Sequence, residues 1–240
     1  MTATPVTTRL VSTITMPRAL PGFQNAPRSQ ASFLSGWEKQ CLAWLAARMP
    51  SRVHPDHLTL LGFAAMFLAG ASYALAAWWP PFLLLVNVWL AVNWFGDSLD
   101  GTLARFRNRQ RPRYGFYVDH MVDSFGALFL LGGLAFSGAM GSGVAFALLV
   151  GFLLLSINTY LATYTLGTFQ LSFWKMSPTE LRILLAIGNT YAWANPTVTL
   201  FGGRERFFDV AGFVGVVCMA FVLVVSVVTN TRALYRLEKF

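Results

Sequence analysis

Four aspartates lie close together in a segment that is bounded by long apolar runs. The chain contains only ten acidic residues, and four of them fall in this segment: Asp97, Asp100, Asp119 and Asp123. The spacing of three residues in the first pair and four in the second places each pair on one face of a helix. Two antiparallel neighbouring helices could therefore present all four carboxylates to one point.

Carboxylates beside apolar segments need compensating positive charge. Insertion scales give about 2.5–3.5 kcal/mol for one Asp at the centre of a membrane helix, so four would cost on the order of 10 kcal/mol. Five arginines follow at alternate positions from Arg105 to Arg113. Convergent carboxylate oxygens also suit hard divalent cations, and four aspartates fit two Mg²⁺ (or Mn²⁺) ions in a phosphoryl-transfer site.

The composition indicates an integral membrane protein. The chain is 55% hydrophobic and 12% charged, whereas soluble domains carry roughly 25% charged residues. The formal net charge is +8, but the basic residues lie beside the apolar segments, so no nucleic acid partner is expected. Cys41 and Cys218 lie in unlike segments without metal-ligand spacing, so neither a disulfide framework nor a zinc site is expected.

The chain divides into three regions. Residues 1–32 form a basic leader that we expect to be poorly ordered. Residues 33–50 are predicted to form an interfacial amphipathic helix, although the same apolar stripe would also suit packing on protein. Residues 51–240 are predicted to form a transmembrane catalytic domain of six helices.

The predicted fold is therefore an all-α integral membrane protein, multi-pass, with six transmembrane helices after the interfacial helix. Uncharged runs long enough to cross about 30 Å of hydrocarbon, and the Gly- and Pro-containing breaks between them, set the expected spans. These spans are 58–79, 82–105, 116–136, 144–167, 178–200 and 210–228.

The distribution of basic residues predicts the orientation. With the N-terminus inside, all of the eighteen Lys and Arg residues except Arg204 and Arg206 face inward, as the positive-inside rule requires. The four aspartates then lie near the inner ends of the second and third spans. We expect the cytoplasmic (inner) membrane, with the acidic site facing the cytoplasm.

The residues around the aspartates carry a family resemblance. The segment "DSLDGTLAR" followed by "GFYVDHMVD" resembles the signature of the CDP-alcohol phosphotransferase family, D-x-x-D-G-x-x-A-R, a spacer and G-x-x-x-D-x-x-x-D. The spacer is one residue longer than is common in that family. All eight signature positions are filled, by Asp97, Asp100, Gly101, Ala104, Arg105, Gly115, Asp119 and Asp123.

The resemblance implies an enzyme that transfers a substituted phosphate from a CDP-linked donor to an acceptor hydroxyl in phospholipid biosynthesis, with release of CMP. One of the two substrates would be a lipid. The donor could be CDP-diacylglycerol with a polar alcohol as acceptor, or CDP-choline or CDP-ethanolamine with diacylglycerol as acceptor. The resemblance also makes a homodimer an expectation, with membrane lipids as neighbours.

The resemblance assigns two ions to the aspartates. Asp97, Asp100 and Asp119 would hold the first ion, and Asp97, Asp119 and Asp123 would hold the second. Both would contact the donor's diphosphate.

The same resemblance assigns the remaining signature residues. Gly101, Ala104 and Arg105 would shape the pocket for the cytidine diphosphate, with Gly115 at the opposite helix start. Asp123 is the implied general base, and His120 is the competing candidate because an imidazole titrates near neutral pH. A structural role for His120 is equally open.

Two further residues have open alternatives. Arg182 lies one turn into the fifth predicted span and faces either the acidic site or the lipid headgroups. Asp56 stands in "PDHLT" where relatives often have Asn, and we expect it to cap the helix that follows.

Two other functions fit part of the pattern. An intramembrane ion transporter would also use carboxylates, but it leaves the glycines, Ala104 and Arg105 unexplained. An aspartate-rich prenyltransferase normally has its two acidic motifs much further apart in sequence.

Overall fold

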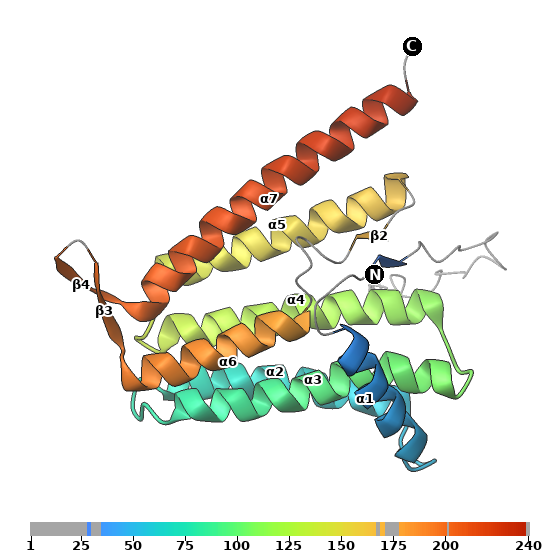
Figure 1. Cartoon of the computed structure of the whole chain (residues 1–240), viewed down its shortest axis with the longest axis horizontal. Coiled ribbons are helices and arrows are strands. Elements are labelled where there is room, and N and C mark those ends of the chain that lie inside the picture. Colours follow the sequence, from blue (N-terminus) through green and yellow to red (C-terminus); the bar gives the residue numbers. More distant parts are fainter. Residues whose placement is uncertain (1–27, 30–34, 167–168, 171–177, 201, 239–240) are drawn as a thin grey trace, which may run out of the picture.

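The computed structural model describes residues 28–29, 35–166, 169–170, 178–200 and 202–238 (Figure 1). Helices dominate this part of the chain: α1 (Ser35–Arg48), α2 (Pro55–Leu75), α3 (Phe82–Phe106), α4 (Pro112–Phe136), α5 (Ser142–Leu166), α6 (Pro178–Ala194) and α7 (Phe207–Leu237). Two strand pairs complete it: β1 (Arg28–Ser29) with β2 (Phe169–Gln170), which are parallel, and β3 (Thr197–Leu200) with β4 (Gly203–Arg206), which are antiparallel.

The long helices form a bundle and an arm. Helix α2 packs against both α3 and α4, and α6 packs against α3. Helices α5 and α7 lie beside each other, and their far ends diverge from the bundle (Figure 1). Helix α1 lies across the bundle and packs on α3.

Five of these helices are long and apolar enough to cross a membrane: α2, α3, α4, α5 and α7. The structure thus agrees with the predicted all-α, multi-pass membrane fold. The predicted count of six is not confirmed, because α6 has 17 residues. At 1.5 Å per residue α6 extends about 26 Å, which is shorter than the roughly 30 Å of a typical hydrocarbon core.

The chain after α6 differs from the prediction. The expected span 178–200 ends at Ala194, and residues 197–200 and 203–206 pair as β3 and β4 instead. Pro196 lacks the N–H that a helix needs, and the β-branched Thr197, Val198 and Thr199 favour an extended chain. The last helix consequently begins at Phe207 and continues to Leu237, beyond the predicted limits of 210 and 228.

The N-terminal predictions are tested only in part. The leader at 1–32 lies outside the described residues except for 28–29. Residues 35–48 are helical within the predicted range 33–50. Their location at a membrane interface stays a prediction.

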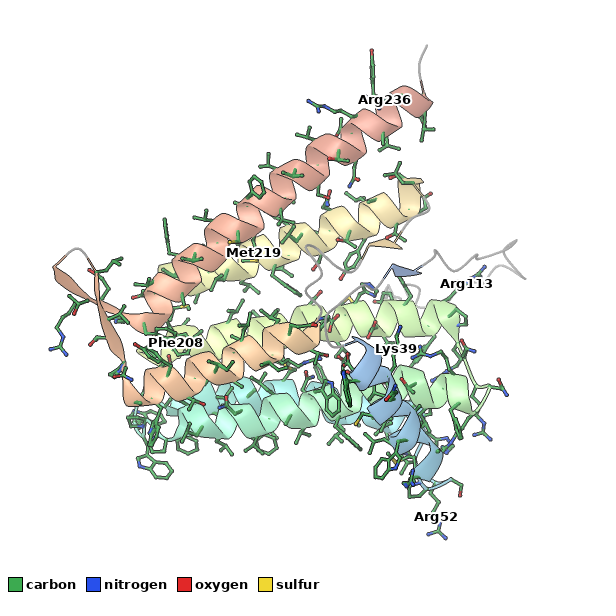
Figure 2. The ribbon with its side chains drawn as sticks, viewed as in Figure 1. Lys39, Arg52, Arg113, Phe208, Met219 and Arg236 are labelled. Atoms are coloured by element: carbon green, nitrogen blue, oxygen red, sulfur yellow. The ribbon has the colours of Figure 1, made fainter. Side chains whose placement is uncertain are left out.

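Several basic residues lie toward one end of the molecule, whereas Arg204 and Arg206 are in β4 at the other. Figure 2 shows Lys39, Arg52 and Arg113 at the end of the bundle where α3 and α4 are joined, whereas Phe208 lies at the opposite end. Arg236 lies at the C-terminal end of α7, on the same side as the first three.

Glycines let α2 approach its two neighbours closely. A Cβ on Gly96 of α3 would lie 2.6 Å from the carbonyl oxygen of Leu58 and 2.7 Å from the backbone nitrogen of Gly62. A Cβ on Gly133 of α4 would overlap the backbone carbonyl of Gly70. Such close contacts replace the hydrophobic effect as a source of helix association in lipid. They hold α3 and α4 on the same helix, α2.

Substitution at Gly133 tests this packing. We expect Gly133→Ala to lower the free energy of unfolding by about 1–3 kcal/mol, because overpacking forces backbones apart. Gly132→Ala is the matched control, since a Cβ there meets nothing within 4 Å. Thermal unfolding in detergent should show a loss of several degrees for Gly133→Ala alone, and equal effects of the two variants would contradict the close contact.

Candidate active site

The four aspartates lie on the two helices that flank the 107–111 loop. Asp97 and Asp100 are in the second half of α3, and Asp119 and Asp123 are in the first half of α4. Asp123 interacts electrostatically with Asp97, Asp119 and Asp100, and Asp100 does so with Asp97 and Asp119. The helical hairpin therefore gathers four carboxylates in one region.

The turn between the helices is defined by local chemistry. Asn108 adopts a positive φ of 53°, a conformation that Asn tolerates better than most residues. Pro112 opens α4, where its missing N–H costs nothing. Arg107 donates hydrogen bonds to the carbonyl oxygens of Val53 (2.5 Å), Met49 (2.9 Å) and Pro50 (2.9 Å). Its guanidinium thereby ties the loop to the α1–α2 connection.

Arg182 of α6 faces the acidic residues. Its Nη2 atom donates to Asp97 Oδ2 at 2.5 Å, and its Nε atom donates to Asn93 Oδ1 at 2.8 Å. Asn93 is buried, and its Nδ2 atom donates to the carbonyl oxygen of Gly62 at 3.0 Å. Of the two orientations open on sequence grounds, the structure thus has Arg182 at the acidic site.

Asp100 is held by α2 and by its own helix. The Thr59 hydroxyl donates to Asp100 Oδ2 at 2.5 Å, and the Gly101 N–H donates to Asp100 Oδ1 at 2.5 Å. Thr59 is the last residue of the "PDHLT" segment, which forms the start of α2.

Asp56, in the same segment, does not cap α2. The helix begins at Pro55 with His54 as its N-cap residue, so Asp56 lies inside the first turn. Its carboxylate forms an ion pair with Arg111 of the loop before α4. The predicted capping role was therefore wrong. The helix begins at Pro55, before Asp56, because proline favours the first helical position.

Open space lies next to the signature residues that were assigned to bind the nucleotide. A Cβ on Gly115 would meet nothing within 4 Å, and one on Gly101 would meet only Arg105 Nη1 at 3.5 Å. Arg105 is exposed, and its Nη2 atom donates to Thr102 Oγ1 at 3.1 Å. Ala104 is partly buried, and its carbonyl oxygen accepts from the Arg109 N–H at 2.9 Å. A ligand can thus approach the backbone of both helix ends without displacing side chains.

His120 points toward α5. Its Nδ1 atom lies 2.5 Å from the carbonyl oxygen of Phe116, and its ring centroid lies 4.2 Å from that of Phe116 and 4.6 Å from that of Tyr160. Tyr160 in turn interacts electrostatically with Asp123 and Asp119. The histidine therefore packs at the α4–α5 contact beside the carboxylates.

The acidic side chains are not arranged as a ready cation cage. Within the ranges that the structure describes, no three His, Cys, Asp or Glu side chains could hold one ion together. Asp97 faces Arg182 and Asp100 faces Thr59. The donor set nevertheless suits a hard divalent cation, because four carboxylates lie together.

Two residues at the site, Thr59 and Tyr160, were missed on sequence grounds, whereas Asn93 has a local signal. Asn93 lies four residues before Asp97, so the helical period places both on one face. Thr59 lies in the "PDHLT" segment, for which the prediction concerned only Asp56. Tyr160 had no local signal, since an aromatic residue in an apolar helix is ordinarily part of the packing.

Comparison with known proteins gives three related proteins. Archaetidylinositol phosphate synthase of Pyrococcus horikoshii is 31% identical over 44% of this chain and 53% of its own length. Cholinephosphotransferase 1 of Gallus gallus is 29% identical over 75% of this chain and 57% of its own. CDP-diacylglycerol–serine O-phosphatidyltransferase of Encephalitozoon cuniculi is 35% identical over 50% of this chain and 32% of its own.

The chain thus spans about half the length of the first two relatives, 53% and 57%, and 32% of the third. No protein-family model matches the sequence.

Proposed function

We infer that the chain belongs to the CDP-alcohol phosphotransferase family, and we propose that it transfers a substituted phosphate from a CDP-linked donor to an acceptor hydroxyl. CMP is the second product. The observation that carries the proposal is the mutual electrostatic interaction of four signature carboxylates beside two glycines that border open space. Such a surface can receive a diphosphate once cations screen the carboxylates.

Divalent cations complete the proposed site. Asp97, Asp100 and Asp119 would hold one Mg²⁺ or Mn²⁺ ion, and Asp97, Asp119 and Asp123 would hold a second. The ions supply positive charge that offsets the donor's diphosphate and the charge that develops on leaving CMP. The oxygen-only donor set of the four aspartates supports this choice of metal.

The protein residues orient the donor and remove a proton. The acceptor oxygen attacks the phosphorus that bears the donor's substituent, and the bond from that phosphorus to the oxygen of CMP breaks. Arg105 carries a guanidinium that suits phosphate oxygens, and Gly101 and Gly115 let the nucleotide approach the helix ends. The hydroxyl proton passes to a carboxylate, for which we favour Asp123.

The assignment of Asp123 as base rests on its surroundings. Asp123 lies among the other three carboxylates. His120, in contrast, has Nδ1 at the carbonyl oxygen of Phe116 and its ring against Tyr160. We therefore assign His120 a structural role at the contact between α4 and α5.

Two classes of donor are candidates, and the names of the relatives include an enzyme of each class. The serine O-phosphatidyltransferase is named for CDP-diacylglycerol, whereas the chicken protein is named a cholinephosphotransferase. A lipidic donor with a polar alcohol and a polar CDP donor with diacylglycerol both require the same chemistry at phosphorus. A role in phospholipid synthesis follows in either case.

We further propose that α6 is a sixth crossing. Arg182 bonds to Asn93 and Asp97 while Asn189 bonds to Asn87, so α6 runs antiparallel to α3 over the same depth. A short span can be accommodated by local thinning of the bilayer. Basic residues at the end where α3 and α4 join support a cytoplasmic active site in the inner membrane. A homodimer remains part of the proposal on family grounds.

The transporter alternative gains no support from the comparisons, since the three relatives are named as a synthase and two transferases. An apparent flux of ions without CMP release would be needed to revive it.

Asp119→Asn tests the metal assignment. We expect the rate of CMP release from CDP-linked donors, with Mg²⁺ present, to fall more than about 100-fold. Mutation of a residue that only hydrogen-bonds to a metal ligand already lowers activity about 10–100-fold, and loss of a ligand itself should lower it further. Asp56→Asn is the control, since Asp56 pairs with Arg111 outside the four carboxylates. The assay uses purified protein in liposomes with CDP-diacylglycerol, CDP-choline and CDP-ethanolamine in separate reactions.

The donor that yields CMP only with its matching acceptor identifies the substrate class. Equal rates for Asp119→Asn and wild type would contradict the metal site, and absence of CMP with every donor would contradict the proposed reaction.

The base assignment is tested by comparing two variants. We expect Asp123→Asn to lose more than about 100-fold in turnover, since general bases contribute 10²–10⁴-fold. His120→Phe keeps the aromatic contacts with Phe116 and Tyr160, and should retain activity within about tenfold of wild type on the same scale. The opposite order of the two losses would make His120 the base.

A further inference from the structure

The ion pair between Arg182 and Asp97 occupies a carboxylate that the proposed function assigns to a cation. We propose that Arg182 is an internal counter-ion, which stabilises the cation-free site by pairing with Asp97 and is displaced from it when a divalent cation binds. The inference rests on the proposed function, because it presumes a cation at these aspartates. It adds a positioning residue outside the signature segment.

The first argument is electrostatic. The side chains of Arg182 and Asp97 are 15% and 22% exposed, so neither charge is well hydrated in the absence of the other. Arg182 also interacts electrostatically with Asp123, and the other charged groups that act on Asp123 are all aspartates. One guanidinium therefore offsets part of the mutual repulsion of the four carboxylates.

Two arginines near the α3–α4 loop are engaged outside the acidic cluster. Arg107 donates to three carbonyl oxygens of the α1–α2 connection, and Arg111 pairs with Asp56. The ion pair that Asp97 forms is with Arg182 of α6, 85 residues away in the chain.

The second argument is that the pair can open without loss of the Arg182 anchor. The Nε atom is held by Asn93 Oδ1 at 2.8 Å, and Asn93 is fixed by its bond to the Gly62 carbonyl oxygen at 3.0 Å. Only the Nη2 contact involves Asp97. Release of that single contact frees the carboxylate while the Nε bond to Asn93 is kept.

The third argument is that α6 is docked independently. Seven residues further along, buried Asn189 accepts a hydrogen bond from the Tyr73 hydroxyl at 2.6 Å and donates to Asn87 Oδ1 at 2.8 Å. Asn87 also donates to the Ala186 carbonyl oxygen at 3.2 Å and to Thr190 Oγ1 at 3.1 Å. These bonds keep α6 on α2 and α3 whether or not Arg182 is paired.

Cation binding and the ion pair therefore compete. A divalent cation and a guanidinium repel each other, and both use the Asp97 carboxylate as partner. The affinity that is measured for the cation is reduced by the stability of the pair, as for any ligand that must displace a competing state.

The test is a Mg²⁺ titration of thermal unfolding, with purified full-length protein in detergent, after treatment with EDTA and without substrate. The wild-type midpoint temperature should rise with Mg²⁺ as ligand linkage requires. For Arg182→Gln we expect a lower midpoint without Mg²⁺ and a half-saturating Mg²⁺ concentration about tenfold lower than in wild type, because the competitor is gone.

Asn189→Ala is the matched control on the same helix. It should lower the midpoint equally at every Mg²⁺ concentration and leave half-saturation unchanged. Arg182→Lys serves if Arg182→Gln does not fold, since one ammonium cannot bridge Asn93 and Asp97 as the guanidinium does. Its half-saturating concentration should fall a few-fold.

The outcomes separate this inference from the proposed function. Half-saturation that is unchanged or raised in the Arg182 variants overturns the counter-ion role, even though the wild type responds to Mg²⁺. A wild-type protein that shows no response to Mg²⁺ or Mn²⁺ overturns the cation site itself, and the counter-ion role with it.

Discussion

The site depends on how the repulsion among four carboxylates, which lie together on two helices of an apolar bundle, is offset. Asp97 and Asp100 on α3 face Asp119 and Asp123 on α4. Such a cluster is costly unless positive charge and hydrogen-bond donors surround it. The elements near it, Arg182 of α6 and Thr59 of α2, supply these partners from distant parts of the chain.

The packing of the helices makes this arrangement possible. Helix α2 contacts α3 and α4 through glycine backbones, which brings Thr59 and the Gly62 carbonyl oxygen to the acidic region. The buried bonds among Tyr73, Asn87 and Asn189 hold α6 against the same helices. These buried hydrogen bonds thus lie toward the end opposite the α3–α4 loop, while the site opens beside Gly101 and Gly115.

Much of the fold could be predicted because long uncharged runs and their Gly- and Pro-containing breaks are local features. The spacing of the aspartates likewise placed each pair on one helical face. The end of α6 could not be predicted from charge alone, because the uncharged run continues through Thr197–Leu200, although Pro196 gives a local signal. The partner of Arg182 could not be predicted for a different reason. An arginine at that depth can reach either a lipid headgroup or a carboxylate, and its partner depends on how α6 packs on α3.

The central claim is that these carboxylates gather a divalent cation between α3 and α4. Anomalous diffraction from crystals of the protein soaked in Mn²⁺ tests it most directly. The account predicts an anomalous peak within about 2–2.5 Å of carboxylate oxygens of Asp97, Asp100, Asp119 or Asp123, with Arg182 no longer on Asp97. A map without a peak there, with the Arg182–Asp97 pair intact at saturating Mn²⁺, would contradict it.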